Sequence, residues 1–90
     1  MEFDSTAVFD KDVGKLDKNE RKMLKELLAR IALQPESGKP MEHHANVFSK
    51  RTTGRRLIWQ FKRQENKILL LLYKNRDEAY EALRGLVFPA

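Results

Sequence analysis

Arg56-Leu57-Ile58-Trp59-Gln60-Phe61-Lys62 is the stretch that decides the fold. Side chains alternate between the two sides of an extended chain, so Leu57, Trp59 and Phe61 fall on one side. The other side carries Arg56, Ile58, Gln60 and Lys62. This period of two predicts a β-strand whose Trp59 side is covered and whose Arg56 side is open.

The flanking sequence predicts partner strands for this segment. Polar Gln64-Glu65-Asn66 has the length of a hairpin turn, and the apolar run Lys67 to Tyr73 follows it as a central strand. On the other side, Val47 to Arg51 precedes the turn Thr52-Thr53-Gly54 and predicts a third strand. We expect an antiparallel meander, to which Met1 to Phe3 can add an edge strand.

The N-terminal third reads as two helices. Asp17-Lys18-Asn19-Glu20 is a capping box, and it begins an apolar stripe that Pro35 ends. The stripe comprises Met23, Leu24, Leu27, Leu28 and Ile31. A shorter stripe predicts a first helix from Thr6 to Leu16. At the other end, Asn75 or Asp77 can cap a last helix that ends at Gly85.

These elements predict a single α+β domain spanning residues 1–90. Two N-terminal helices pack on one face of a small, mainly antiparallel sheet of three to four strands, and a short C-terminal helix follows. The apolar run Ile68 to Tyr73 is far too short to span a membrane, and the N-terminus carries acids instead of a signal sequence. We therefore expect a cytoplasmic protein without a membrane partner.

Positive charge is concentrated in one part of the chain. The net charge is +5, and the segment between His43 and Gln64 contains six Lys and Arg residues but no Asp or Glu. A concentrated field of this kind attracts phosphates. The segment therefore predicts an RNA-binding surface, the alternative being an ordinary solvated sheet face. The predicted phosphate-binding residues are Arg51, Arg55, Gln60, Lys62 and Lys74.

Phosphodiester cleavage without a metal needs a base, a cation beside the phosphorane and an acid. The chain has no cysteine and two histidines, so we expect no metal site and no cofactor. Arg56 suits the cationic role because its guanidinium matches phosphate oxygens. Glu42, His43 and His44 precede the second strand, although the histidines could equally be a solvated loop pair. Tyr80 could act at the site or simply pack.

Several segments together resemble the RelE/ParE superfamily of bacterial and archaeal toxins. Arg51-Thr52-Thr53 followed by Gly54 to Gln60 is similar to its Arg-Ser-Ser-Gly-Tyr-Arg-Leu-Val-Tyr-Gln type stretch. Phe9 to Leu16 resembles its first helix, Gly38-Lys39-Pro40 resembles the loop of its YoeB/Txe branch, and Asn75 to Tyr80 resembles its C-terminal Arg and Tyr ending. The similarity covers most of the chain.

The resemblance implies a metal-free, ribosome-dependent endonuclease that cuts mRNA in the ribosomal A site. Its partner would be an antitoxin, through an acidic or helical segment that covers the basic groove. Arg56 matches the family's phosphate-stabilising arginine and Tyr80 its C-terminal tyrosine. Arg76 or Lys74 matches the basic group that can serve as the acid.

The family pattern leaves the general base open among Glu42, Lys50 and His44. The RelE pattern has two lysines on the second strand, where this chain has Val47 and Ser49, with Lys50 out of register. In the YoeB pattern a glutamate follows Lys-Pro directly, whereas Met41 intervenes here. Two other functions stay open: a ParE-like inhibitor of DNA gyrase, and a non-catalytic module that binds RNA or protein.

Overall fold

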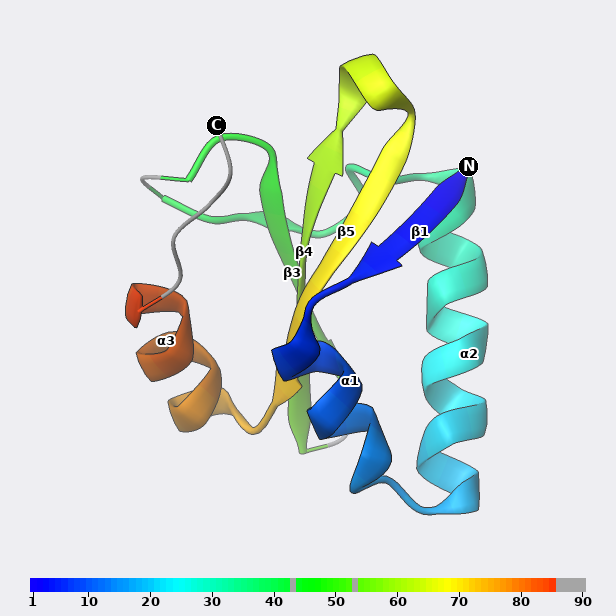
Figure 1. The fold of residues 1–90 in the computed structure, drawn as a ribbon, viewed down its shortest axis with the longest axis vertical. Helices are drawn as coiled ribbons and strands as arrows, with labels where there is room; N and C mark the ends of the chain where they lie inside the picture. Colours follow the sequence, from blue (N-terminus) through cyan, green and yellow to red (C-terminus); the bar gives the residue numbers. More distant parts are fainter. Residues whose placement is uncertain (43, 53, 86–90) are drawn as a thin grey trace.

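A five-stranded sheet forms the centre of the molecule, with strand order β1-β5-β4-β3-β2. The computed structural model describes residues 1–42, 44–52 and 54–85 (Figure 1). The strands are β1 (Glu2–Ser5), β2 (Lys39–Pro40), β3 (Val47–Thr52), β4 (Arg55–Lys62) and β5 (Lys67–Lys74). Only β1 pairs in parallel, with β5, and the other pairs are antiparallel. The predicted meander is confirmed, and the two-residue β2 brings the strands to five.

The helices are α1 (Ala7–Gly14), α2 (Lys18–Leu33) and α3 (Arg76–Gly85), and a 3-10 turn, η1 (Arg63–Glu65), joins β4 to β5. Each α-helix begins at a polar cap. Thr6 accepts a hydrogen bond from the Phe9 amide, Asp17 and Glu20 form the predicted capping box, and the Asn75 side chain accepts from the Glu78 amide. Asn75, rather than Asp77, therefore caps the last helix. No helix among the described residues is long and apolar enough to cross a membrane.

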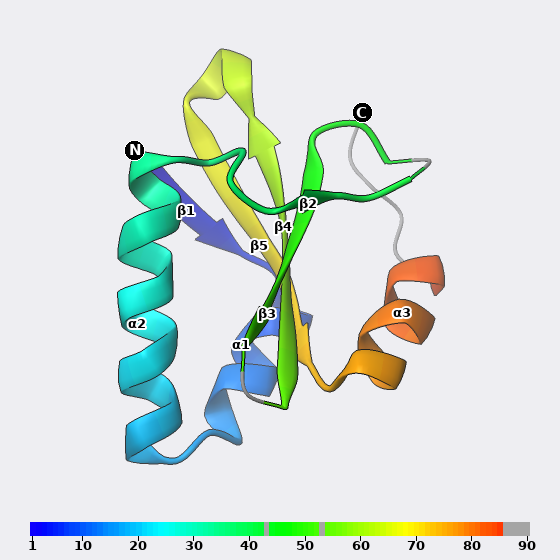
Figure 2. The same ribbon diagram turned by 180° about the vertical axis from the view of Figure 1, so that it is seen from behind.

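Two apolar clusters pack against opposite faces of the sheet, as α2 and α3 stand on opposite sides of it (Figure 2). The larger cluster joins Leu24, Leu27 and Ile31 of α2 to Leu57 and Trp59. This arrangement confirms the predicted α+β class with two N-terminal helices on one face.

The second face differs from the open surface that we expected. Ile58 lies on the same side of β4 as Arg56, yet it is fully buried in a cluster with Ala79 and Leu83 of α3. Without α3, the apolar side chains of Ile58 and Leu72 would form a hydrophobic patch exposed to water, and packing α3 over them buries that area. The helix therefore covers the middle of this face and leaves its charged end for a site.

Candidate functional site

Three basic residues stand side by side across the end of the sheet. Arg56 on β4 lies directly opposite Arg51 on β3 and opposite Lys74 on β5. Residues paired in this way point their side chains to the same face. We call Arg51, Arg56 and Lys74 the cationic row.

Arg56 is held in place from two sides. Its Nη1 donates a hydrogen bond of 3.0 Å to the hydroxyl of Ser49, a buried residue of β3. Its guanidinium carbon lies 5.4 Å from the centre of the Tyr80 ring of α3, within the range of a cation–π contact. The helix that covers Ile58 thus also delivers Tyr80 to the arginine.

One donor of Arg56 has no acceptor in the part of the chain that the structure describes. Its Nε is buried and makes no hydrogen bond to any described residue. Buried N–H groups in proteins are nearly always paired, so a donor without a partner among the described residues is unusual.

A hollow of about 270 Å³ adjoins Arg56 at the β3–β4 turn. Its lining includes Arg51, Arg55, Arg56 and Arg76, and no Asp or Glu is among the described residues that line it. Arg55 is less available than the others because its Nε donates to Glu20 at 3.0 Å and its guanidinium lies over Tyr73. The hollow is suited to an anion.

Tyr80 connects Arg56 to a second hollow of about 360 Å³. Lys39, Pro40, Met41 and Glu42 line this hollow together with Tyr80. Glu42 is exposed. Glu42 and Tyr80 therefore line one hollow, whereas Arg56 and Arg76 line the other, and the contact between Arg56 and Tyr80 links the two.

The other two base candidates lie elsewhere. Lys50 is paired with Leu57, whose side chain belongs to the α2 cluster, so Lys50 faces α2 and borders a hollow with Met23 and Leu27. His44 is half-buried in the loop before β3, where its backbone bonds to Met41 and Val47. The adjacent His43 lies outside the described residues, as does Thr53 of the predicted turn.

The remaining predicted phosphate ligands point away from the hollow or are already paired. Lys74 Nζ lies 2.7 Å from a carboxylate oxygen of Asp12. Lys62 is opposite Lys67 near η1, and Gln60 and Lys62 line a separate hollow at that far end of β4. Arg63, also at that end, pairs with Glu36; this hydrogen bond lowers the pKa of Glu36 and raises that of Arg63.

No protein-family model matches the chain, and no curated protein matches its sequence. Solved structures do match. The isolated RelE toxin of E. coli has a TM-score of 0.75 and 20% identity, covering 96% of this chain and 98% of that one. The chain has the RelE fold. The toxin–antitoxin complex RelBE2 of Mycobacterium tuberculosis has a TM-score of 0.72 and 22% identity, covering 83% of this chain and 96% of that one. The RelB–RelE complex of Methanococcus jannaschii has a TM-score of 0.69 and 16% identity, covering 91% of this chain and 98% of that one.

Within this RelE fold, the sequence analysis missed two residues around Arg56. Ser49 was noted only as the place of a family lysine, whereas its buried hydroxyl holds the arginine. The alternation along β3 could have signalled it, since Ser49 and Arg51 share a face. Asp12 is the second, and nothing local in the sequence links it to Lys74, 62 residues away.

Proposed function

We propose that the chain is the toxin of a type II toxin–antitoxin pair and a metal-free endoribonuclease that cuts mRNA in the ribosomal A site. The observation that carries the proposal is the contact between Arg56 and Tyr80 beside an arginine-lined hollow. The RelE fold supports it, because the similar E. coli structure is that of a toxin and two similar structures are toxin–antitoxin complexes. The chain itself would be cytoplasmic, and an antitoxin with an acidic or helical segment is its expected partner.

The proposed chemistry is attack of the ribose 2′-oxygen on the adjacent phosphorus. A base removes the 2′-hydroxyl proton, the new O2′–P bond forms, and the bond from phosphorus to the 5′-oxygen breaks. Arg56 stabilises the added negative charge on the phosphorane through its guanidinium, which lies at the arginine-lined hollow. The 5′-oxygen takes up a proton, so the products carry a 2′,3′-cyclic phosphate and a 5′-hydroxyl.

We assign the remaining roles by proximity. Glu42 is the preferred base, because it borders the hollow that Tyr80 shares. Tyr80 stacks on the scissile nucleotide or acts at it, and Arg76, which lines the arginine-lined hollow, is the basic group that can serve as the acid. Lys50 becomes the least favoured base because it faces α2.

The same observation about Lys50 favours the alternative of a non-catalytic RNA-binding module. Ser49 stands where the RelE pattern has a strand lysine, and its hydroxyl accepts a hydrogen bond from Arg56. On the face of β3 that Ser49 shares with Arg51, Arg51 is therefore the one basic residue that the strand contributes. Such a module would bind RNA through the cationic row without cutting it.

Induced expression of the wild type, Arg56→Ala and Arg63→Ala tests the proposal. Arg63 is the matched control because it lies at the far end of β4, paired with Glu36. We expect the wild type and Arg63→Ala to arrest translation and to yield mRNA fragments with 5′-hydroxyl ends, mapped by primer extension, and Arg56→Ala to do neither.

Other outcomes separate the alternatives. Intact mRNA together with DNA breaks would indicate a gyrase inhibitor. RNA binding without cleavage would indicate a non-catalytic module. Equal toxicity of Arg56→Ala and the wild type would remove Arg56 from the mechanism.

A further inference from the structure

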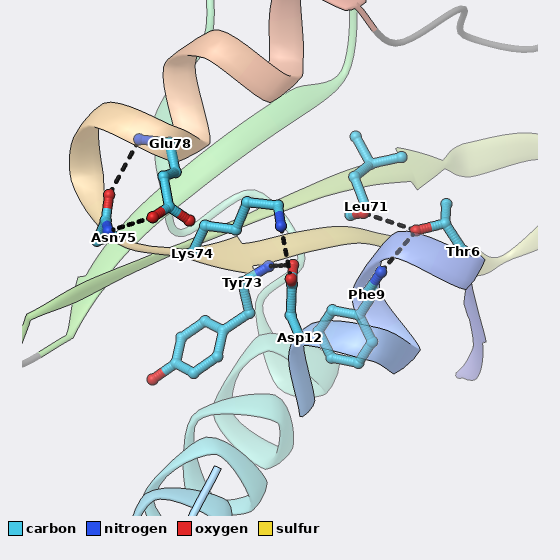
Figure 3. A network of polar contacts seen from close by, with 8 residues as sticks. All are labelled: Thr6, Phe9, Asp12, Leu71, Tyr73, Lys74, Asn75 and Glu78. Atoms are coloured by element: carbon cyan, nitrogen blue, oxygen red, sulfur yellow. Dashed lines mark hydrogen bonds and ion pairs between the residues drawn. The ribbon is translucent and has the colours of Figure 1, made fainter. Parts of the chain in front are cut away.

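A buried carboxylate lies at the edge of the site. Asp12 of α1 has 3% of its surface exposed, and it accepts two hydrogen bonds. Its Oδ2 accepts from the Tyr73 amide at 3.1 Å, and its Oδ1 accepts from Lys74 Nζ at 2.7 Å (Figure 3). One acid therefore binds both the backbone of β5 and a member of the cationic row.

The position of Asp12 is set by the edge of the sheet. Strand β1 pairs with β5 only as far as Ser5 and Leu70, after which the chain turns into α1. The Thr6 hydroxyl donates a hydrogen bond to the Leu71 carbonyl. Two residues further along β5, the Asp12 carboxylate accepts a hydrogen bond from the Tyr73 amide. Helix α1 thus replaces β1 as the partner of this edge (Figure 3).

Lys74 would otherwise extend along the same face as Arg56, its cross-strand partner. A lysine side chain is long and flexible, and its ammonium can reach a phosphate bound at the neighbouring arginine. The Asp12 contact draws the ammonium toward α1 and cancels its charge. The other two members of the row, Arg51 and Arg56, form no ion pair with any described residue.

We infer that Asp12 is a positioning residue that withholds Lys74 from bound RNA and so limits the number of phosphates the site neutralises. The inference rests on the proposed function, in that RNA is the ligand of the row. Each phosphate neutralised on a single strand steepens the dependence of log affinity on log salt by about 0.7. Freeing Lys74 should therefore raise affinity by about fivefold at 0.1 M salt.

The test is the affinity of a short single-stranded RNA across a salt series, measured by fluorescence anisotropy. Asp12→Asn keeps an oxygen that can accept from the Tyr73 amide but removes the charge that holds Lys74. We expect it to bind RNA about fivefold more tightly than the wild type at 0.1 M salt, with a slope steeper by about 0.7. Lys74→Met added to Asp12→Asn should cancel both gains.

Two results would overturn the inference: an unchanged slope in folded Asp12→Asn, or a steeper slope that persists in the double variant. Circular dichroism establishes that each variant is folded. If Asp12→Asn does not fold, the inference is tested by comparing Lys74→Met with Arg51→Met in the otherwise wild-type protein. Lys74→Met should then flatten the slope less than Arg51→Met, and an equal effect of the two would overturn the inference.

A separate readout keeps this inference distinct from the proposed function. Lys74 should be acetylated by a lysine-specific reagent several-fold faster in Asp12→Asn than in the wild type, whether or not RNA binds. Absence of RNA binding with faster acetylation would count against the proposed function alone. Equal acetylation would count against the withholding of Lys74.

Discussion

The guanidinium of Arg56 lies over the ring of Tyr80, with 5.4 Å between its carbon and the ring centre. The two residues come from β4 and α3, and the apolar packing of Ile58 against Ala79 and Leu83 fixes their elements together. The burial of Ala79 and Leu83 in α3 therefore sets the position of Tyr80, which lies between them, relative to Arg56 on β4. Substitutions that keep the ring should keep the arginine in place.

Tyr80→Phe and Tyr80→Ala should differ in RNA cleavage. The phenylalanine ring retains the face on which Arg56 rests, whereas alanine removes a contact of about 0.5–2 kcal/mol. We expect Tyr80→Ala to lower kcat by about 2- to 30-fold. Tyr80→Phe should retain most of the rate if the ring only stacks. A loss in Tyr80→Phe as large as in Tyr80→Ala would show that the hydroxyl takes part in the reaction.

Ser49→Ala should slow cleavage through Arg56. The Ser49 hydroxyl accepts a charge-assisted hydrogen bond, a class worth about 1.5–3 kcal/mol, from a guanidinium whose Nε is already unpartnered. We expect kcat to fall by about 10- to 100-fold, measured on a defined mRNA with purified ribosomes. Ser37→Ala, at an exposed loop position, is the matched control and should cleave at the wild-type rate. Unchanged cleavage in Ser49→Ala would mean that Arg56 is oriented without Ser49.

Part of this site follows from local sequence patterns, and part does not. The alternation from Arg56 to Phe61 correctly separated Arg56 from Trp59, because strand parity is a local property. Arg51 and Lys50 could not be separated in the same way, since their faces depend on register. The pairing of Thr52 with Arg55 sets that register and places Arg51, rather than Lys50, opposite Arg56.

The contacts that depend on chain topology were not predictable. Asp12 contacts Lys74 because β1 pairs with β5 in parallel and ends at Ser5. The following helix α1 therefore lies beside the C-terminal end of β5, where Lys74 is. Likewise, the burial of Ile58 needs α3 to fold back over the sheet. An alternating strand pattern indicates which residues share a face but does not indicate what covers it.

Acid should weaken the ion pair between Glu36, in the loop before β2, and Arg63, in the turn between β4 and β5. The hydrogen bond from Arg63 lowers the pKa of Glu36 below its ordinary value of 4.5. A carboxyl group whose pKa is lower in the folded state stabilises the fold above its unfolded pKa, and this contribution is lost as pH falls through the folded pKa. The melting temperature of Glu36→Gln should therefore fall below that of the wild type at pH 7, and the difference should shrink as the pH falls below 4.5 and Glu36 becomes protonated in the folded protein. A difference that does not shrink as the pH is lowered would assign the effect to packing.

Gly38 and Gly14 should respond oppositely to alanine. A Cβ at Gly38 would lie 2.5 Å from the Trp59 ring and 2.7 Å from the Ser49 carbonyl oxygen, both fixed in the core, whereas a Cβ at Gly14 would meet nothing within 4 Å. Overpacking of this kind typically costs about 1–3 kcal/mol, and replacing a helical glycine by alanine typically adds about 0.5–1 kcal/mol.

We therefore expect Gly38→Ala to lower the free energy of unfolding and Gly14→Ala to raise it, measured by urea denaturation. Because Ser49 also holds Arg56, Gly38→Ala should slow RNA cleavage even where the variant is fully folded. Gly14→Ala should cleave at the wild-type rate. A Gly38→Ala variant with wild-type stability would mean that β2 can move away from Trp59, and the position of Ser49 would then not depend on this glycine.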